Sequence, residues 1–229
     1  MIKRTSRKNI INLFKENPDW NILDLGGGKD PFRDAQTVAD VMDYTEYYKQ
    51  THKEKTFIRT EGDGTPFKNK EFDFVTACHI VEHVPDPDQF IEELTRIGKR
   101  GYIEVPTPFF DNLTQGNSNP IPHGHLWWTT FDDDTQELVL RPKISLTKEI
   151  LSPRQTTMLM PFFVDSMVIG LLWEDSIEYR KEEAIYEYDA GNSDPKRRVD
   201  MTKGTPQGFK KWGMDLQMQD VIMYAVENA

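Results

Sequence analysis

Three consecutive glycines after a short apolar run are the residues best suited to receive a ligand. The run at 21–25 surrounds Asp24 and ends in the turn 26–28. Glycine has no side chain, so a ligand can approach the backbone closely at such a turn. Asp40 ends the next apolar run, where a carboxylate can bind both hydroxyls of a ribose. The pattern predicts a nucleoside-binding site, and the alternative is a tight turn followed by an unrelated carboxylate.

The spacing of the glycines separates two kinds of nucleoside ligand. A dinucleotide site requires G-x-G-x-x-G and a helix whose amino end holds a pyrophosphate. Here Pro31 takes the place of the third glycine, and the residues between Gly28 and Val38 are too few for a standard crossover helix. We therefore expect a ligand without a pyrophosphate, such as S-adenosylmethionine, which needs an open glycine turn, a ribose carboxylate and an adenine pocket.

A second group, His79, Glu82 and His83, spells H-x-x-E-H, the inverted zinc-protease signature. That signature requires a helix long enough to present both imidazoles to one metal ion. Pro85 follows too soon for such a helix, and His79 directly succeeds a buried-strand pattern. A zinc hydrolase using these residues is a remote alternative, and we predict no metal site.

A third group lies in the sequence His123-Gly124-His125-Leu126-Trp127-Trp128. His123 and His125 are candidate proton acceptors, and the two tryptophans, with His123, are candidate walls of an acceptor pocket. A His-x-His pair also suits a metal, but no third ligand is evident nearby in the sequence. The alternative is that the tryptophans fix this segment to the core and the histidines bond to backbone.

The elements that must position these residues alternate between strands and helices. Apolar runs predict strands at 21–25, 37–40, 56–58, 72–78 and 101–105. Helical spacing predicts a helix at 6–16 and another from the capping Asp86 to Gly98, which we expect to end it in a left-handed conformation. Strand, helix and strand in this order indicate a parallel α/β sheet.

The second half of the chain is less regular. An irregular insertion is expected at about 107–136, followed by strands at 137–146 and 167–179, with a helix between them from about Ser152. A polar excursion at about 189–206 precedes a closing helix at 214–226. We expect one domain over 1–229, because the length suits one full-sized core.

Composition limits the class of protein. The 229 residues include 28 Lys+Arg and 38 Asp+Glu, a net charge of −10, which disfavours a nucleic-acid partner. With 37% hydrophobic and 29% charged residues, a soluble globular protein is expected. The longest apolar run, 167–173, is too short for a bilayer, and the basic start lacks the apolar segment of a signal peptide. Cys78 is the single cysteine, so no internal disulfide forms, and a cytoplasmic location is expected.

Three segments taken together resemble a known family. The sequences ILDLGGG at 22–28, TPFKNKEFDFV at 65–75 and HIVEHVPDP at 79–87 are similar to the class I S-adenosylmethionine-dependent methyltransferases, and more narrowly to their type 11 group. The resemblance covers roughly residues 20–106. It implies a doubly wound, mostly parallel seven-stranded sheet with a reversed last strand, helices on both faces, and the cofactor over the carboxyl ends of the first two strands.

The resemblance also assigns residues to the cofactor S-adenosylmethionine. Gly26 and Gly28 would contact its amino-acid portion, Asp40 its ribose, and Asp63 its adenine amino group. The full set of cofactor residues is Asp24, Gly26, Gly27, Gly28, Asp40, Asp63, Gly64, Cys78 and His79. Two departures from the family leave the ribose ligand open between Asp40 and Asp43: the shortened crossover after the turn and the second carboxylate nearby.

The expected activity is methyl transfer to an O- or N-nucleophile of a small molecule or sugar, with His79, His125 or His123 as the catalytic proton acceptor. A non-catalytic module that binds the adenosyl cofactor or serves as a scaffold is the alternative, because motifs that hold a cofactor say nothing about an acceptor. Neither the acceptor nor the oligomeric state follows from the sequence.

Overall fold

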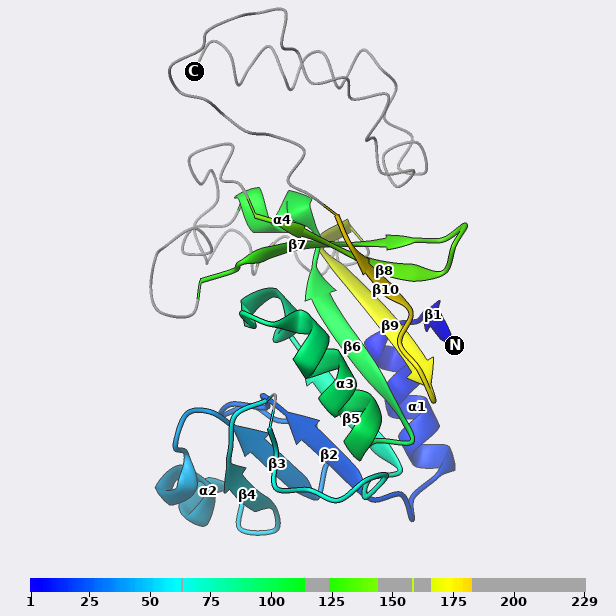
Figure 1. The fold of residues 1–229 in the computed structure, drawn as a ribbon. Helices are drawn as coiled ribbons and strands as arrows, with labels where there is room; N and C mark the ends of the chain where they lie inside the picture. Colours follow the sequence, from blue (N-terminus) through cyan, green and yellow to red (C-terminus); the bar gives the residue numbers. More distant parts are fainter. Residues whose placement is uncertain (63, 114–123, 144–157, 159–165, 183–229) are drawn as a thin grey trace, which may run out of the picture.

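The computed structural model describes residues 1–62, 64–113, 124–143, 158 and 166–182 (Figure 1). Within them, seven strands form the main sheet in the order β1-β9-β6-β5-β2-β3-β4. In chain order these strands are β1 (Ile2–Arg4), β2 (Ile22–Leu25), β3 (Thr37–Asp40), β4 (Thr56–Arg59), β5 (Phe74–Cys78), β6 (Arg100–Pro106) and β9 (Val168–Glu174).

Five of the seven strands, β2 to β6, run parallel to their neighbours among them. β9 pairs antiparallel with β6, and β1 pairs antiparallel with β9 at the sheet edge. The order reverses between β2 and β5, so the carboxyl ends of these strands flank a switch point, where open α/β sheets bind ligands. The predicted fold class, with a reversed last strand, is confirmed.

Helices lie on both faces of this sheet, α1 and α3 on opposite sides (Figure 1). The helices are α1 (Arg7–Glu16), α2 (Thr45–Thr51), the 3₁₀ helix η1 (Val81–His83), α3 (Pro87–Ile97) and α4 (Pro108–Leu113). From α1, Ile10 and Phe14 pack against Phe74 of β5, whereas Phe90 and Leu94 of α3 belong to the larger core on the other face. Periodicity predicted both helices because each has one apolar face.

The end of α3 differs from the prediction. Asp86 caps the helix through hydrogen bonds from the amides of Asp88 and Gln89, as the capping pattern predicts. Gly98, however, has φ −105° and ψ 148°, an extended and not a left-handed conformation. Glycine is required there for space, because a Cβ would lie 2.7 Å from Cγ2 of Val75.

The segment after β6 is more regular than its composition indicates. A second sheet has the strand order β10-β8-β7. Its strands are β7 (Trp127–Asp132), β8 (Glu137–Pro142) and β10 (Tyr179–Lys181). The expectation of a wholly irregular insertion is therefore wrong for α4 and β7. The helix expected from Ser152, the excursion at 189–206 and the closing helix lie outside the described residues.

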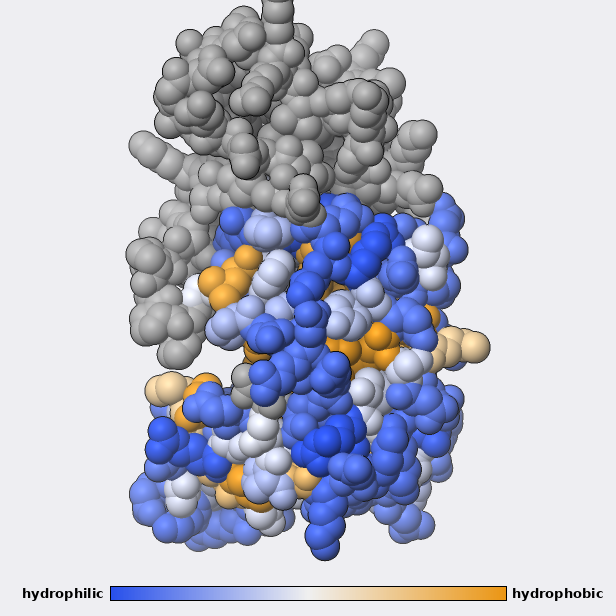
Figure 2. All heavy atoms as spheres, viewed as in Figure 1, coloured by the Kyte–Doolittle hydropathy of each residue, from blue (hydrophilic) through white to orange (hydrophobic). Residues whose placement is uncertain are grey.

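The face of the molecule that Figure 2 shows is largely polar where residues are described. In the view of Figure 2 the described residues are mostly hydrophilic, with apolar side chains in small separate patches. Such scattered patches are ordinary on a globular surface. None of the helices in the described ranges combines the length and the apolar character that a membrane span requires.

Candidate active site

The glycine turn has two packed positions and one open position. Gly26 and Gly28 adopt positive φ angles of 75° and 55°. A Cβ on Gly26 would lie 2.1 Å from Cδ1 of Ile80, and one on Gly27 would lie 2.7 Å from Oδ2 of Asp24. A Cβ on Gly28 would meet nothing within 4 Å. The first two glycines therefore make the turn possible, and the third leaves space at its surface.

Asp40 lies beside that open position. Its Oδ2 accepts a hydrogen bond from the amide of Gly28 (3.1 Å), and its Oδ1 accepts one from the amide of Met42 (2.8 Å). Asp43 is exposed, and its carboxylate accepts a hydrogen bond from the amide of Thr45 at the start of α2. Of the two candidate ribose ligands, only Asp40 is bonded to the glycine turn.

Asp24 supports the turn from within the fold. It is buried, and its carboxylate accepts hydrogen bonds from the amide of Phe32 (2.8 Å) and the hydroxyl of Thr76 (2.6 Å). Burial raises the pKa of Asp24 to about 6 against the opposing effect of these hydrogen bonds. Both carboxylate oxygens are thus engaged by the protein itself.

The short connection from β2 to β3 contains no helix, as its length predicts, and other side chains hold it. Nζ of Lys55 donates to the carbonyls of Phe32 (3.3 Å), Arg33 (2.7 Å) and Ala35 (2.6 Å). The hydroxyl of Tyr48 donates to the carbonyl of Gly28 (2.8 Å). These bonds occupy carbonyls that a crossover helix would have satisfied internally.

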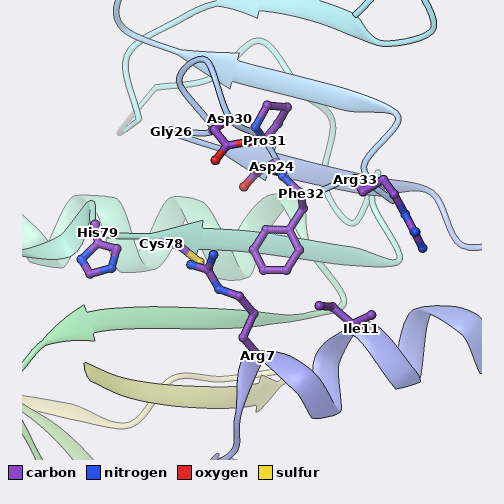
Figure 3. A pocket seen from close by; sticks show the side chains of 11 residues that line it. Arg7, Ile11, Asp24, Gly26, Asp30, Pro31, Phe32, Arg33, Cys78 and His79 are labelled. Carbon is purple, nitrogen blue, oxygen red and sulfur yellow. Dashed lines mark hydrogen bonds between the residues drawn. The ribbon is translucent and has the colours of Figure 1, made fainter. Parts of the chain in front are cut away.

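A cavity of about 370 Å³ opens on one side of the turn (Figure 3). Its lining residues are Arg7, Ile11, Asp24, Gly26, Gly27, Asp30, Pro31, Phe32, Arg33, Cys78 and His79. Figure 3 shows Arg7 and Ile11 rising from α1 and Asp30 and Pro31 reaching down from the loop after the turn. Gly26 and Gly27 of the turn line this cavity, whereas Gly28 and Asp40 are not among its lining residues.

His79 directly follows β5 and has a left-handed backbone, with φ 57°. Nδ1 of its ring lies 3.4 Å from Oε1 of Glu82, and Nε2 lies 3.4 Å from Oε1 of Glu104. Burial alone would lower the pKa of His79, but the two carboxylates raise it to about 9. The neighbouring Cys78 is a poor nucleophile, because burial raises the pKa of its thiol well above the usual range.

Glu104 of β6 and Arg7 of α1 were not predicted as site residues. The guanidinium of Arg7 donates twice to the Glu104 carboxylate (2.6 and 3.2 Å), and the hydroxyl of Tyr102 donates to it (2.6 Å). Burial would raise the pKa of Glu104, but His79, Arg7 and Tyr102 lower it to about 2. The available signal was one acidic residue inside an otherwise apolar strand.

Hydrogen bonds connect the loop before β5 to α3. Oε1 of Glu93 accepts hydrogen bonds from the amide and the hydroxyl of Thr65, and Arg96 donates to the same carboxylate. The neighbouring Gly64 is exposed, and a Cβ there would meet nothing within 4 Å. The predicted adenine-binding Asp63 lies outside the described residues.

The histidines and tryptophans of the segment 123–128 do not gather at one site in the structure. Trp127 packs against the main core, and its Nε1 donates to the carbonyl of Val84 (2.8 Å). Adjacent strand residues point to opposite faces, so Trp127 and Trp128 do not line one side of the same pocket. Nδ1 of His125 lies 2.5 Å from Oδ1 of Asp111. His123 lies outside the described residues.

Comparison with known proteins shows what the segment that carries the turn is similar to. Residues 26–103 match the family model described as "Methyltransferase domain", Methyltransf_11. This segment is therefore similar to methyltransferase domains of that family. A curated relative, an uncharacterized methyltransferase of Mycolicibacterium vanbaalenii, is 31% identical over 94 residues, which cover 37% of this chain and 37% of the relative. The similarity therefore spans well under half of either protein.

Solved structures resemble the methyltransferase domain at low identity. The YcgJ protein from Bacillus subtilis is 12% identical, with a TM-score of 0.44, over 74% of this chain and 99% of its own. The PH0226 protein from Pyrococcus horikoshii is 15% identical, with a TM-score of 0.43, over 74% of this chain and 92% of its own.

S-adenosylmethionine is the cofactor of this domain class, and the described residues fit it. The free space at Gly28 lies next to the carboxylate of Asp40, as a ribose ligand requires. The switch-point location suits a nucleoside ligand, and the lack of a helix between β2 and β3 suits one without a pyrophosphate. When bound, this cofactor supplies an activated methyl group.

Proposed function

We propose that this protein transfers a methyl group from S-adenosylmethionine to an O- or N-nucleophile of a small molecule or sugar. The observation that carries the proposal is the open position at Gly28, whose amide is bonded to the carboxylate of Asp40 at the carboxyl edge of the sheet. That carboxylate would bind the ribose hydroxyls. Cys78 and His79, at the end of the adjacent strand β5, would face the reacting centre.

In such a reaction the protein mainly aligns the two reactants and excludes water, since the sulfonium donor is already activated. The chain needs no covalent nucleophile. His79 and His125 are the described candidates for positioning the acceptor or taking its proton. The carboxylates of Glu104 and Glu82 each lie 3.4 Å from a nitrogen of the His79 ring, and Asp111 orients the His125 ring.

The net charge of the chain favours a small-molecule acceptor over a nucleic acid. The chain carries a net charge of −10, which opposes the close approach of DNA or RNA phosphates. A single cysteine and no need for disulfides favour the reducing cytoplasm as its location.

A methyl-transfer assay tests the proposal directly. Protein is incubated with S-adenosylmethionine labelled in the methyl group and with fractions of a small-metabolite extract, and label is sought in each fraction. We expect label in a discrete fraction with the wild type and with the control His52→Ala, but much less with His125→Ala. Affinity for S-adenosylhomocysteine should be equal in all three proteins. Cofactor binding without label in any fraction would favour the non-catalytic module.

A further inference from the structure

Three metal-ligating side chains meet where the 3₁₀ helix η1 faces the start of β7. Glu82 and His83 come from η1, and His125 lies two residues before β7. One donor atom from each lies within 4.8 Å of the other two. Donors bound to one ion at about 2.1 Å are separated by roughly 3–4 Å, so small side-chain movements would bring these three to bonding distance.

Glu82 is the unusual member of this group. Its side chain is fully buried, and neither carboxylate oxygen has a hydrogen-bond partner among the described residues. Oε1 lies 3.4 Å from Nδ1 of His79 and 4.0 Å from Nε2 of His125, without hydrogen-bond geometry to either. Buried carboxylates are costly unless they are hydrogen-bonded, ion-paired or coordinate a metal. The imidazoles of His79 and His125 are the cationic partners that the described residues offer Glu82, and neither is hydrogen-bonded to it, so its surroundings also suit a metal ion.

His125 is oriented as metal-binding histidines usually are. Nδ1 faces Oδ1 of Asp111 at 2.5 Å, which leaves Nε2 directed toward Glu82. Nζ of Lys143 lies 3.0 Å from the second oxygen of Asp111. A carboxylate on the far nitrogen of a ligating histidine fixes the ring and its tautomer.

The two backbone segments that carry the metal-ligating side chains, η1 and the start of β7, are hydrogen-bonded to each other. The amide of Leu126 donates to the carbonyl of Glu82 (2.6 Å), and Nε1 of Trp127 donates to the carbonyl of Val84 (2.8 Å). The His125 and His83 rings meet edge to face with their centroids 4.5 Å apart. The donors are thus held on a connected frame, as a preformed site requires.

We propose that Glu82, His83 and His125 form a binding site for a divalent first-row transition metal ion. Two imidazoles and one carboxylate suit Zn²⁺, Co²⁺, Mn²⁺ or Fe²⁺ and leave coordination positions open. The site differs from the H-x-x-E-H signature, because His125 from a distant segment takes the place of His79. The third ligand that the sequence around His125 lacks is supplied by the fold.

The ion would lie close to the proposed reaction centre, since His79 lines the cavity and also faces Glu82. Its open positions would take water or an oxygen atom of the acceptor, and His125 would then be a ligand and not a proton acceptor. This role rests on the proposed methyl transfer, whereas the metal site does not.

The test measures metal binding without any cofactor. The full chain is stripped with a chelator and titrated with CoCl₂, ZnCl₂ and MnCl₂, and bound metal is measured after equilibrium dialysis. Visible absorption of Co²⁺ reports its nitrogen and oxygen ligands. We expect one ion per chain, at least tenfold weaker binding in Glu82→Gln and in His125→Ala, and unchanged binding in His52→Ala and His79→Gln.

Substoichiometric binding by the wild type, or equal binding by Glu82→Gln and His125→Ala, would overturn the proposal. Loss in His79→Gln with retention in His125→Ala would instead favour the H-x-x-E-H set. Circular dichroism and affinity for S-adenosylhomocysteine are measured on each variant, so that a failure of the cofactor site is distinguished from a failure of the metal site.

Discussion

Gly26 and Gly28 share a left-handed backbone but have different surroundings, which gives a matched pair of substitutions. Gly26→Ala meets the Ile80 side chain, so we expect the free energy of unfolding to fall by about 2–5 kcal/mol. Gly28→Ala adds only backbone strain, about 1–2 kcal/mol, because nothing lies near its Cβ. Urea denaturation measures both values.

The same pair separates stability from ligand binding. We expect Gly28→Ala to weaken binding of S-adenosylhomocysteine by about tenfold or more, since the methyl group enters the space assigned to the ligand. Full affinity in folded Gly28→Ala would place the ligand elsewhere.

Glu104 predicts a pH dependence of stability. Its pKa falls from 4.5 to about 2 in the fold, so its ionised form stabilises the protein above pH 4.5, and this contribution is lost as the pH falls through about 2. The contribution is about 3 kcal/mol. The difference in unfolding free energy between wild type and Glu104→Gln should therefore shrink between pH 4.5 and pH 2. A constant difference would show that Arg7 and His79 do not stabilise the carboxylate.

Among single residues, the glycine turn and Asp40 were predicted from the sequence to form the site, whereas Arg7 and Glu104 were not predicted. The turn follows from local chemistry, because glycines after a strand have few other uses. Arg7 and Glu104 meet only when α1 and β6 are brought together, and no local pattern encodes that contact.

Among the elements, the loop between β2 and β3 depends on Lys55. Lys55→Met keeps the apolar stem but removes the donations to three carbonyls, so we expect a loss of about 2 kcal/mol in stability and weaker binding of S-adenosylhomocysteine. Lys53→Met, at an exposed position nearby, is the matched control. Thermal denaturation and calorimetric titration measure the two effects. Equal behaviour of the two variants would contradict the role given to Lys55.

Elements with strong local periodicity were predicted well, and those that depend on distant partners were not. α1, α3 and the parallel strands carry clear apolar patterns and caps. β1 has only three residues and is a strand because β9 pairs with it. β7 alternates apolar and polar residues only partly, and its pairing with β8 defines it.

At the scale of the whole molecule, topology brings the site together. The order reversal between β2 and β5 places the glycine turn beside Cys78 and His79, although about fifty residues separate them in the chain. This adjacency was predicted through the family resemblance, since the handedness of a crossover does not by itself fix which strands are neighbours. The second sheet, which brings His125 against η1, was not predictable because no crossover rule governs it.

Calorimetric titration with S-adenosylhomocysteine shows whether the glycine turn and Asp40 bind the adenosyl cofactor. Wild type, Asp40→Ala and Asp43→Ala are compared, each after a check of folding by circular dichroism. We expect binding by the wild type and by Asp43→Ala, and binding at least about tenfold weaker in Asp40→Ala, because only Asp40 is bonded to the glycine turn. No binding by the wild type, or equal binding by Asp40→Ala, would contradict this expectation.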